Sequence, residues 1–410
     1  RIPIEPRSVG IAALQTAEMD CASVNLADSD RRRPMRRQEI AGITGARGLA
    51  AISVVLFHFG SELAEILPSF AHLEPVWKQG YLGVDLFFMV SGFVLAYVYA
   101  DQAVLGVFSF REFCLRRFAR IYPNYAASLL ALLALVLAAG LVDRQIDGEY
   151  SELEFVSQAL VVHALPIPGV YSRAAAWNYP SWSVSAEVFA YVALFPLLLW
   201  LFTRRYRPIR FGPWLSSALM AVGGLIAFYG WLGVWHSILR ITIEFTAGYI
   251  LFLSWGRSAT TLRAPMLTMP LVAFSALVLP FTLTNAVVPV VLAGLMPVLI
   301  LALAEQRRPV TKLMSRKPVV FLGKISYAIY LWHAIVEKVL KVALPAEGFG
   351  DSSLVARASV AAVYLVAPIV VGAVTYICWE QPANKYLIRR HAVVGDRKRR
   401  DTQPPANPHH

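Results

Sequence analysis

The chain has 410 residues, of which 57% are hydrophobic and only 16% charged, with a mean hydropathy of +0.55. Because about a quarter of the residues in a soluble globular protein are charged, this composition excludes an ordinary soluble enzyme. The net charge of +12 does not indicate nucleic-acid binding, since the basic residues fall in short clusters between apolar runs. Ten apolar helices of about 20 residues each would use roughly 200 residues, so the length fits one all-α, polytopic membrane domain.

The two ends of the chain are polar and basic. Residues 1–40 are expected to form a disordered cytoplasmic tail in which Met35 is a candidate start, and Ile11–Leu14 is too short for the apolar core of a signal peptide. Residues 41–380 are expected to form the membrane domain, and residues 381–410 a basic cytoplasmic tail. The three cysteines have no ligand spacing, so no metal site and no disulfide framework are predicted.

Hydropathy and flanking charge predict ten membrane helices along the chain. No internal repeat is visible, which argues against an inverted-repeat transporter. The expected spans are Ile43–Phe59, Tyr81–Tyr99, Tyr125–Leu141, Ser181–Phe202, Trp214–Gly230, Ser237–Trp255, Met266–Leu283, Val287–Ala304, Phe321–Leu340 and Ala358–Trp379.

The distribution of Lys and Arg predicts the orientation. The segments on the side of the N-terminus carry 29 of them and the opposite segments carry 4, which places both termini in the cytoplasm. The long outer loop 143–180 contains a mildly amphipathic stretch, Leu153–Leu165, that is expected on the membrane surface rather than across it. The aromatic residues Trp177, Tyr179 and Trp182 fit an interfacial belt or, less simply, a surface for stacking on a sugar.

Two titratable residues in the first span lie on one helix face. Arg47 and His58 are 11 positions apart, which is about 20° from the same face and roughly 16 Å along the helix axis. Arg47 is expected toward the cytoplasm and His58 toward the outer surface. Because charge at bilayer depth is costly, each is a candidate site residue. The alternatives are a snorkelling arginine at the flank of the span and an interfacial histidine.

Further charged residues fall in the second, fourth and sixth spans. Asp85 lies near the outer end of its span, where it is either functional or a structural carboxylate paired with a basic group. Glu187 follows Ser183 by four positions and has no basic partner on its own helix. Arg240 and Glu244 are also four positions apart and most simply pair with each other.

The ninth span carries a polar stripe in an apolar helix. Its members lie within about 40° of one face, and they are Ser326, Tyr330, His333 and Glu337. His333 falls in the outer half, where the alternative to a functional role is a structural hydrogen bond between helices. The titratable groups that we expect at one depth are His58, Asp85, Glu187 and His333.

Three arginines follow the second span in the first inner loop. Arg116, Arg117 and Arg120 could form one anion-binding edge, or they could be ordinary positive-inside charge. Arginines bind polyphosphate through charge-assisted contacts, and a histidine with a carboxylate nearby suits general-base activation of a hydroxyl. Together these groups predict a phosphorylated cytoplasmic donor and an outer acceptor.

Several motifs, taken in order, resemble one known family. They are Arg47 with His58, then Gly80-Tyr81-Leu82-Gly83-Val84-Asp85-Leu86-Phe87-Phe88-Met89-Val90-Ser91-Gly92-Phe93, Arg116-Arg117-Phe118-Ala119-Arg120-Ile121-Tyr122-Pro123, Trp182-Ser183-Val184-Ser185-Ala186-Glu187 and Ser326-Tyr327-Ala328-Ile329-Tyr330-Leu331-Trp332-His333. Their order and spacing over residues 40–390 resemble the acyltransferase-3 family of integral membrane O-acyltransferases, which are related to bacterial surface-polysaccharide O-acetylases.

This resemblance implies transfer of an acyl group, commonly acetyl from acetyl-CoA, to a hydroxyl of a cell-surface or lipid-linked carbohydrate, in a bacterial inner membrane. It implies essential roles for Arg47 and His58. From their positions in neighbouring spans, Glu187, and secondly Asp85, are expected to orient His58 or a substrate hydroxyl. Acyl-CoA would be a substrate rather than a bound cofactor, and the oligomeric state is open. Some members of the family carry a further extracytoplasmic domain, so this chain is expected to act alone or with a partner. The expected donor site is Arg116, Arg117 and Arg120, and the expected acceptor site is Trp182, Ser183, Ser326, Tyr330 and His333.

Two hypotheses from other classes remain open. A transporter or lipid flippase would use the same buried charges for substrate passage, and acyl-CoA consumption that depends on a glycan acceptor distinguishes it from an enzyme. A non-catalytic membrane scaffold explains poorly why so many ionisable groups are buried.

Overall fold

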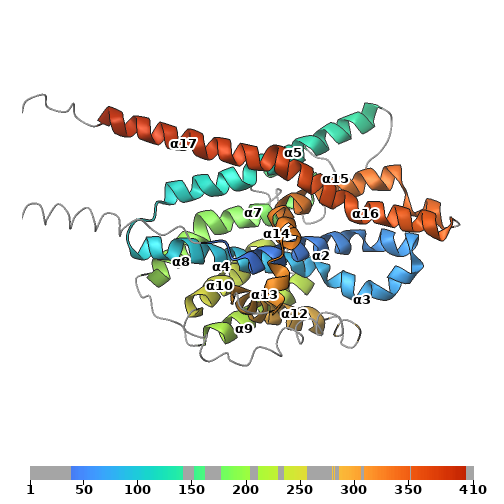
Figure 1. The fold of residues 1–410 in the computed structure, drawn as a ribbon, viewed down its shortest axis with the longest axis horizontal. Helices are drawn as coiled ribbons and strands as arrows, with labels where there is room; N and C mark the ends of the chain where they lie inside the picture. The colour runs from blue at the N-terminus through green and yellow to red at the C-terminus, as the bar shows by residue number, and fades with distance from the viewer. Residues whose placement is uncertain are drawn as a thin grey trace, which may run out of the picture.

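The computed structural model describes residues 38–141, 152–161, 177–203, 211–229, 235–255, 279, 281, 286–305, 309–350 and 352–402. Throughout these residues every regular element is a helix (Figure 1). By length and composition, eight of these helices could cross a membrane, or nine if one bent pair counts as a span. The expected all-α polytopic fold is therefore confirmed. The expected span Met266–Leu283 lies almost wholly outside the described residues.

The helices run roughly along one direction (Figure 1). The long ones are α2 (Ala41–Ile66), α4 (Gly83–Val104), α5 (Phe110–Leu141), α9 (Gly212–Tyr229), α10 (His236–Ser254), α12 (Val287–Ala304), α15 (Ser326–Ala343), α16 (Leu354–Thr375) and α17 (Gln381–Thr402). The shorter ones are η1 (Pro68–Leu73), α3 (Glu74–Trp77), η2 (Lys78–Leu82), α6 (Glu152–Ala159), α7 (Ser181–Phe189), η3 (Ala190–Leu194), α8 (Phe195–Thr203), α13 (Pro309–Met314), α14 (Lys317–Lys324), η6 (Ala346–Phe349) and η7 (Tyr376–Glu380).

Helix α2, which carries Arg47 and His58, packs against η2, α4, α14, α15 and α16. Its first turns have glycine on the packed face, and this allows a close approach of backbones. A Cβ on Gly48 would lie 2.8 Å from the backbone nitrogen of Gly323, and one on Gly323 of α14 would lie 1.8 Å from the carbonyl oxygen of Thr44. The contact between α2 and α14 therefore depends on glycine on both sides, and it fixes the helix that carries the site.

Helices α4 and α10 also meet through glycine. A Cβ on Gly92 would lie 2.0 Å from the carbonyl oxygen of Phe245, and one on Gly248 would lie 1.9 Å from that of Met89. Two reciprocal glycines let the two backbones touch, as small residues do in membrane helix pairs. This close contact positions the charged residues that the two helices carry.

The third membrane helix begins 15 residues before the expected start at Tyr125, because α5 is helical from Phe110. The three arginines of the expected inner loop are therefore on a helix, which continues through Pro123. The prediction failed because the first turns of α5 are charged. Apolarity marks where a helix lies in lipid and says nothing of how far the helix extends into water.

Two other spans differ from simple helices. The ninth is bent by 63° between α14 and α15. The fourth passes through one π-helical turn, η3, between α7 and α8, and such turns are frequent at functional sites. At the end of the chain, the basic segment expected as a tail is helical to Thr402 as α17, which follows α16 and η7 directly.

The aromatic residues of the expected outer loop are not an interfacial belt. Trp177 is buried against Phe155 of α6, with ring centroids 4.9 Å apart, and Tyr179 and Trp182 line a cavity. Helix α6 has 8 residues, which is too short to cross a bilayer. Its carbonyl oxygens accept hydrogen bonds from Tyr125 and Tyr122 of α5, so it packs on the protein; residues 162–165 of the expected amphipathic stretch lie outside the described residues.

Candidate active site

Three cavities follow one another through the bundle. The arginine cavity (about 70 Å³) lies at the end of the bundle where α5 begins, the histidine cavity (about 370 Å³) lies toward the other end, and the neck cavity (about 40 Å³) lies between them. Arg47 and Glu187 line both the arginine and the neck cavity, and Val84 and Tyr330 line both the neck and the histidine cavity. The three cavities therefore form a path of adjoining spaces along the helix bundle.

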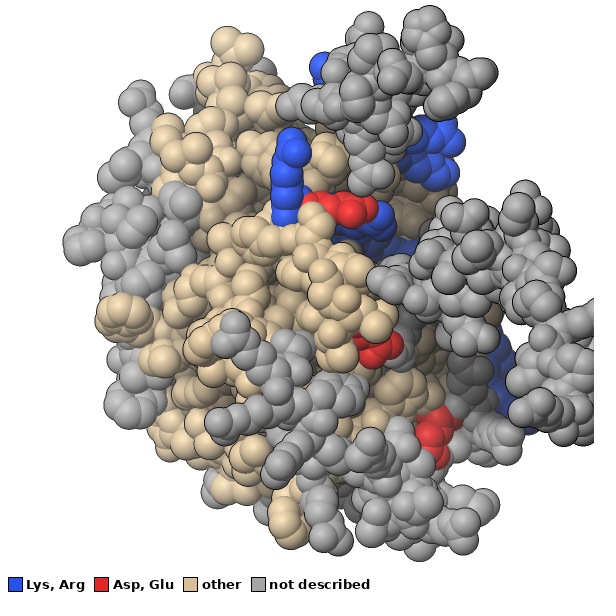
Figure 2. Space-filling view, turned by 90° about the vertical axis from the view of Figure 1, so that its left-hand side faces the viewer, with Lys and Arg blue, Asp and Glu red and all other residues tan. Residues whose placement is uncertain are grey.

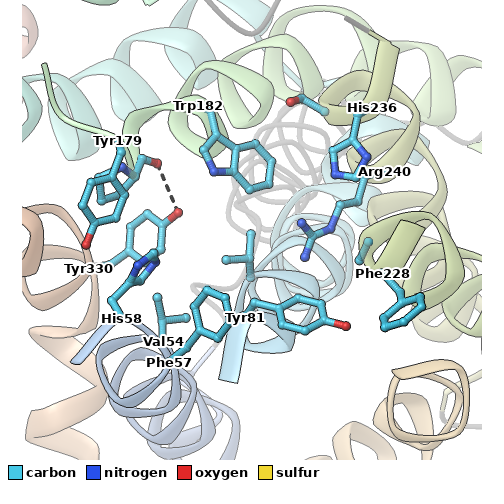
Figure 3. Close-up of a pocket in the computed structure, with 14 residues that line it drawn as sticks. Val54, Phe57, His58, Tyr81, Tyr179, Trp182, Phe228, His236, Arg240 and Tyr330 are labelled. Carbon is cyan, nitrogen blue, oxygen red and sulfur yellow. Dashed lines mark hydrogen bonds between the residues drawn. The ribbon is translucent and has the colours of Figure 1, made fainter. Parts of the chain in front are cut away.

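The histidine cavity is walled mostly by aromatic rings, with polar groups on opposite sides (Figure 3). His58, Tyr179 and Tyr330 lie on one side, while His236 and Arg240 lie on the other. Rings with a few convergent polar groups are typical of small-molecule sites. The remaining lining residues are Val54, Phe57, Tyr81, Val84, Pro180, Trp182, Ala227, Phe228 and Ser237.

His58 contacts two aromatic neighbours from other segments. Its ring centroid lies 4.6 Å from that of Tyr179 and 5.1 Å from that of His333. His333 is fully buried, and its Nδ1 lies 2.6 Å from the carbonyl oxygen of Tyr330. The hydroxyl of Tyr330 donates to the carbonyl oxygen of Pro180 at 3.1 Å, the bond drawn in Figure 3. Two predicted residues, His58 and His333, are thus brought together.

An ion-pair network holds Tyr179, whose ring lies beside His58. Tyr179 donates to Oε2 of Glu337 at 2.6 Å, and Lys341 binds both Glu337 at 2.7 Å and Glu62 at 2.8 Å. Burial, and then the charge of Glu337, raise the pKa of Tyr179 well above its usual range, so this hydroxyl stays protonated and donates. The predicted polar stripe of α15 therefore includes a structural member, Glu337.

Asp85 does not lie against His58. It forms a buried ion pair with the guanidinium of Arg240, whose Nε is 3.2 Å from Oδ1 of Asp85 and 3.4 Å from Oε1 of Glu244. The expected pair of Arg240 with Glu244 on its own helix is present, and the contact of α10 with α4 adds a second carboxylate, Asp85, which was not predicted as its partner. Arg240 also packs over the ring of Trp182 at 5.3 Å. These two side chains, Arg240 and Trp182, form one wall of the histidine cavity.

Glu187 lies with Arg47 rather than with His58. Its Oε1 accepts hydrogen bonds from Ser91 at 3.0 Å and from Tyr191. Arg47 contacts the ring of Phe87 at 6.0 Å. Among the described residues it forms no ion pair, although Glu187 lines the same two cavities. An arginine inside the bundle without an ion-pair partner is suited to bind an electronegative group of a ligand.

The three arginines of α5 have different surroundings. Arg116 is half-exposed and forms an ion pair with Glu112, one turn earlier. Arg117 and Arg120 line the arginine cavity, and Nε of Arg117 has no hydrogen-bond partner among the described residues. Nη1 of Arg120 lies 3.7 Å from Glu380, which is buried. Only two of the three predicted arginines therefore face the cavity.

Figure 2 views the molecule from the end that lies on the left in Figure 1. Lys and Arg side chains gather in the upper part of this face, with an acidic side chain among them, while much of the rest is uncharged. A cluster of basic side chains on one face favours the approach of anionic groups to that face.

Sequence reasoning missed several residues of the site. Ser326 is buried, but its neighbour Tyr327 lines the neck and arginine cavities. Ser183, another candidate, donates to the hydroxyl of Tyr330 at 2.8 Å. Hydroxyl groups in apolar helices give little signal, because helical position alone does not say which neighbour they meet. The lining residues with polar groups that were not predicted are Tyr81, Ser91, Tyr191, His236, Ser237 and Tyr327.

Comparisons with known proteins give one consistent result. The sequence profile of a family described as an acyltransferase domain matches residues 40–378. Acyltransferase MdmB of Streptomyces mycarofaciens is 28% identical over 394 residues, covering 88% of this chain and 96% of the relative. Peptidoglycan O-acetyltransferase OatA of Listeria monocytogenes is 21% identical over 352 residues, covering 75% of this chain and 52% of the relative, so this chain spans about half the length of OatA. No solved structure matches the chain.

Proposed function

Because the chain belongs to the acyltransferase-3 family, and is thus an integral membrane O-acyltransferase, we propose that it moves an acyl group from cytoplasmic acyl-CoA to a hydroxyl of an extracytoplasmic or lipid-linked carbohydrate. The group we propose is acetyl, and the membrane is a bacterial inner membrane with both chain termini in the cytoplasm. The OatA name, which contains both peptidoglycan and O-acetyl transfer, supports an acceptor of this class.

The arginine cavity supports the donor side of the proposal. Coenzyme A carries its phosphates at one end and its acyl group at the other end of a long, thin arm. Arg117 and Arg120 would hold the phosphates at the cytoplasmic end, since arginine suits phosphate geometry. Arg47, between the arginine and neck cavities, would bind the arm or the thioester oxygen deeper in the membrane.

The histidine cavity supports the acceptor side. Its aromatic walls suit the apolar faces of a sugar ring, and His236 and Tyr330 offer polar groups to its hydroxyls. His58 would take the proton of the acceptor hydroxyl as the oxygen attacks the thioester carbonyl. The carbon–sulfur bond then breaks, and the leaving thiolate takes the proton from His58. The products are an ester and the free thiol of coenzyme A.

The placement of Arg47 is the main support for this proposal. This arginine lies on the same helix as His58, lines two cavities that lead toward that histidine, and has no ion pair among the described residues. A structural arginine in a membrane is paired. An arginine whose guanidinium faces a cavity without an ion-pair partner is suited to polarise a ligand that enters through the arginine cavity.

His58→Ala is expected to reduce acyl transfer by about 10²- to 10⁴-fold, because a positioned base is lost, while the protein still inserts. The measurement is release of free coenzyme A thiol by purified protein in vesicles that hold acetyl-CoA on one side and a glycan acceptor on the other. Near-normal transfer by this variant would contradict the role of His58. Radiolabelled acyl trapped on the wild type, but not on the variant, would show transfer through an acyl-histidine.

The same vesicles separate an enzyme from a transporter or flippase. A transporter moves its substrate chemically unchanged, so movement of the glycan without thiol release would overturn the proposed reaction. Mass spectrometry of surface glycans from cells with and without the protein would then identify the hydroxyl that carries the acyl group.

A further inference from the structure

In the part of the chain that the structure describes, no carboxylate forms a hydrogen bond or ion pair with His58. Within the described residues, Asp85 is bound to Arg240, Glu187 to Ser91 and Tyr191, Glu62 to Lys341, and Glu337 to Lys341 and Tyr179. A histidine acts as a base only when the nitrogen that faces the substrate lacks its proton, and a partner on the other nitrogen normally decides this. The partner of His58 must therefore be a group of another kind.

The neighbour with a free acceptor atom is His333. Its Nδ1 lies 2.6 Å from the carbonyl oxygen of Tyr330, and because a carbonyl oxygen only accepts, Nδ1 carries the proton. A neutral imidazole then has a bare lone pair on Nε2. This Nε2 is buried and has no hydrogen-bond partner among the described residues. A buried acceptor without a donor is costly, which favours a role for the atom.

The two rings are spaced for a hydrogen bond. Their centroids are 5.1 Å apart, and two imidazoles joined by an N–H···N bond have centroids about 5 Å apart, given an N···N distance of about 2.9 Å. The rings are tilted by 38°, so rotation of the His58 ring would make the bond, while His333 keeps its contact with the carbonyl oxygen of Tyr330. Tyr179 packs against both rings and is itself held by Glu337, which restrains them as a unit.

We propose that His333 is a positioning residue for His58, an inference that rests on the proposed function. Nε2 of His333 accepts the N–H of His58, so that the other ring nitrogen of His58 is bare toward the histidine cavity. That nitrogen takes the proton of the acceptor hydroxyl and returns it to the thiolate of coenzyme A, while His333 keeps its own proton on Nδ1. The backbone carbonyl of Tyr330, through His333, thus sets the tautomer of the base without placing a second charge in the membrane.

The first test compares His333→Leu, which has no acceptor, with His333→Gln, whose amide oxygen reaches near the position of Nε2. We expect the Leu variant to lose about 10- to 100-fold in kcat, as when the orienting partner of a ligating histidine is removed, with an unchanged KM for acetyl-CoA. The Gln variant should keep most of the activity. Val336→Ala, a loss of buried volume elsewhere on α15, is the matched control and should leave kcat near the wild-type value.

A second test does not need the acyl-transfer reaction. Diethyl pyrocarbonate modifies the bare nitrogen of an imidazole, and peptide mass spectrometry gives its rate at His58 alone. We expect this rate to fall in His333→Leu and to recover in His333→Gln. Equal rates in wild type and the Leu variant, or equal kcat losses in the Leu and Gln variants, would overturn the positioning role. Absence of acetyl-CoA consumption by the wild type would contradict the proposed function instead.

Discussion

The polar residues inside the bundle divide into paired and unpaired groups, and the division separates structure from chemistry. Asp85 and Arg240 neutralise each other, while Arg47 and Arg117 have polar atoms that face cavities without an ion-pair partner among the described residues. A buried charge that already has a partner gains little from a ligand, whereas an unpaired one gains a strong contact. Pairing therefore identifies the residues whose substitution should change kinetics rather than stability.

Substitutions of the α5 arginines test this division. Arg117→Gln should raise the KM for acetyl-CoA, because a phosphate contact is lost, and Arg47→Gln should mainly lower kcat. Arg116→Gln is the matched control, since Arg116 is half-exposed and bound to Glu112; its kinetics should equal those of the wild type. The measurement is acetyl-CoA titration with purified protein. A raised KM in the Arg116 variant alone would place the donor on the other face of α5.

The buried triad around Arg240 should respond in stability. Asp85→Asn leaves Glu244 as a partner at 3.4 Å, so a modest loss is expected. Arg240→Met leaves two buried carboxylates without their cationic partner, and removing one partner of a buried ion pair costs about 3–5 kcal/mol of folding free energy. Thermal unfolding in detergent should therefore give a much lower Tm for Arg240→Met, and adding Asp85→Asn and Glu244→Gln to it should recover part of the loss. Equal Tm values for the two single variants would contradict the triad.

At the scale of helices, the site is positioned by backbones in contact. Helices α4 and α10 touch through Gly92 and Gly248, and this contact brings Asp85 and Arg240 together. Because the two glycines face the carbonyl groups of the opposite helix, a methyl group on either one has no room. The wall of the histidine cavity thus depends on residues that make no contact with its contents.

Gly248→Val is expected to destabilise the protein, since its Cβ would lie 1.9 Å from a carbonyl oxygen and overpacking costs about 1–3 kcal/mol or more. Gly140→Val is the control, because nothing lies within 4 Å of a Cβ at that position of α5. Yield of monodisperse protein and Tm in detergent are the measurements. A Gly248 variant that is as stable as the Gly140 variant would mean that the helices can separate without loss.

The sequence predicted most of the membrane helices but not which side chains of different helices contact each other. Apolar runs mark spans because lipid excludes polar residues, and so α12 has the expected bounds, whereas α2 continues past the expected end at Phe59 to Ile66. The start of α5 was missed because a helix continues into water on charged residues. The partner of Asp85 was missed because it comes from α10, and helix neighbours are not encoded in the periodicity of one helix.

For the molecule as a whole, the cavities matter more than any one residue. Arg47 and His58 were expected on one stripe of α2, and the adjoining cavities lie along that helix. The expectation that His58, Asp85, Glu187 and His333 share one depth did not separate the two ends of this path, since Glu187 belongs with Arg47. One helix gives distance along its axis, but only the packed bundle shows which groups face the same space.

The small size of the neck cavity has a consequence for the cell's energy supply. At about 40 Å³ it has room for about three waters, which is too few for the full water shell of a metal ion, so a hydrated ion cannot follow the acyl arm. The protein should therefore not let ions leak across the membrane. Vesicles that contain it should hold an imposed potassium gradient as long as protein-free vesicles do, measured with an entrapped potassium-sensitive dye. Tyr330→Ala, which widens the boundary between the neck and histidine cavities, should make the gradient decay faster, and a fast decay with the wild type would show that the neck is not a seal.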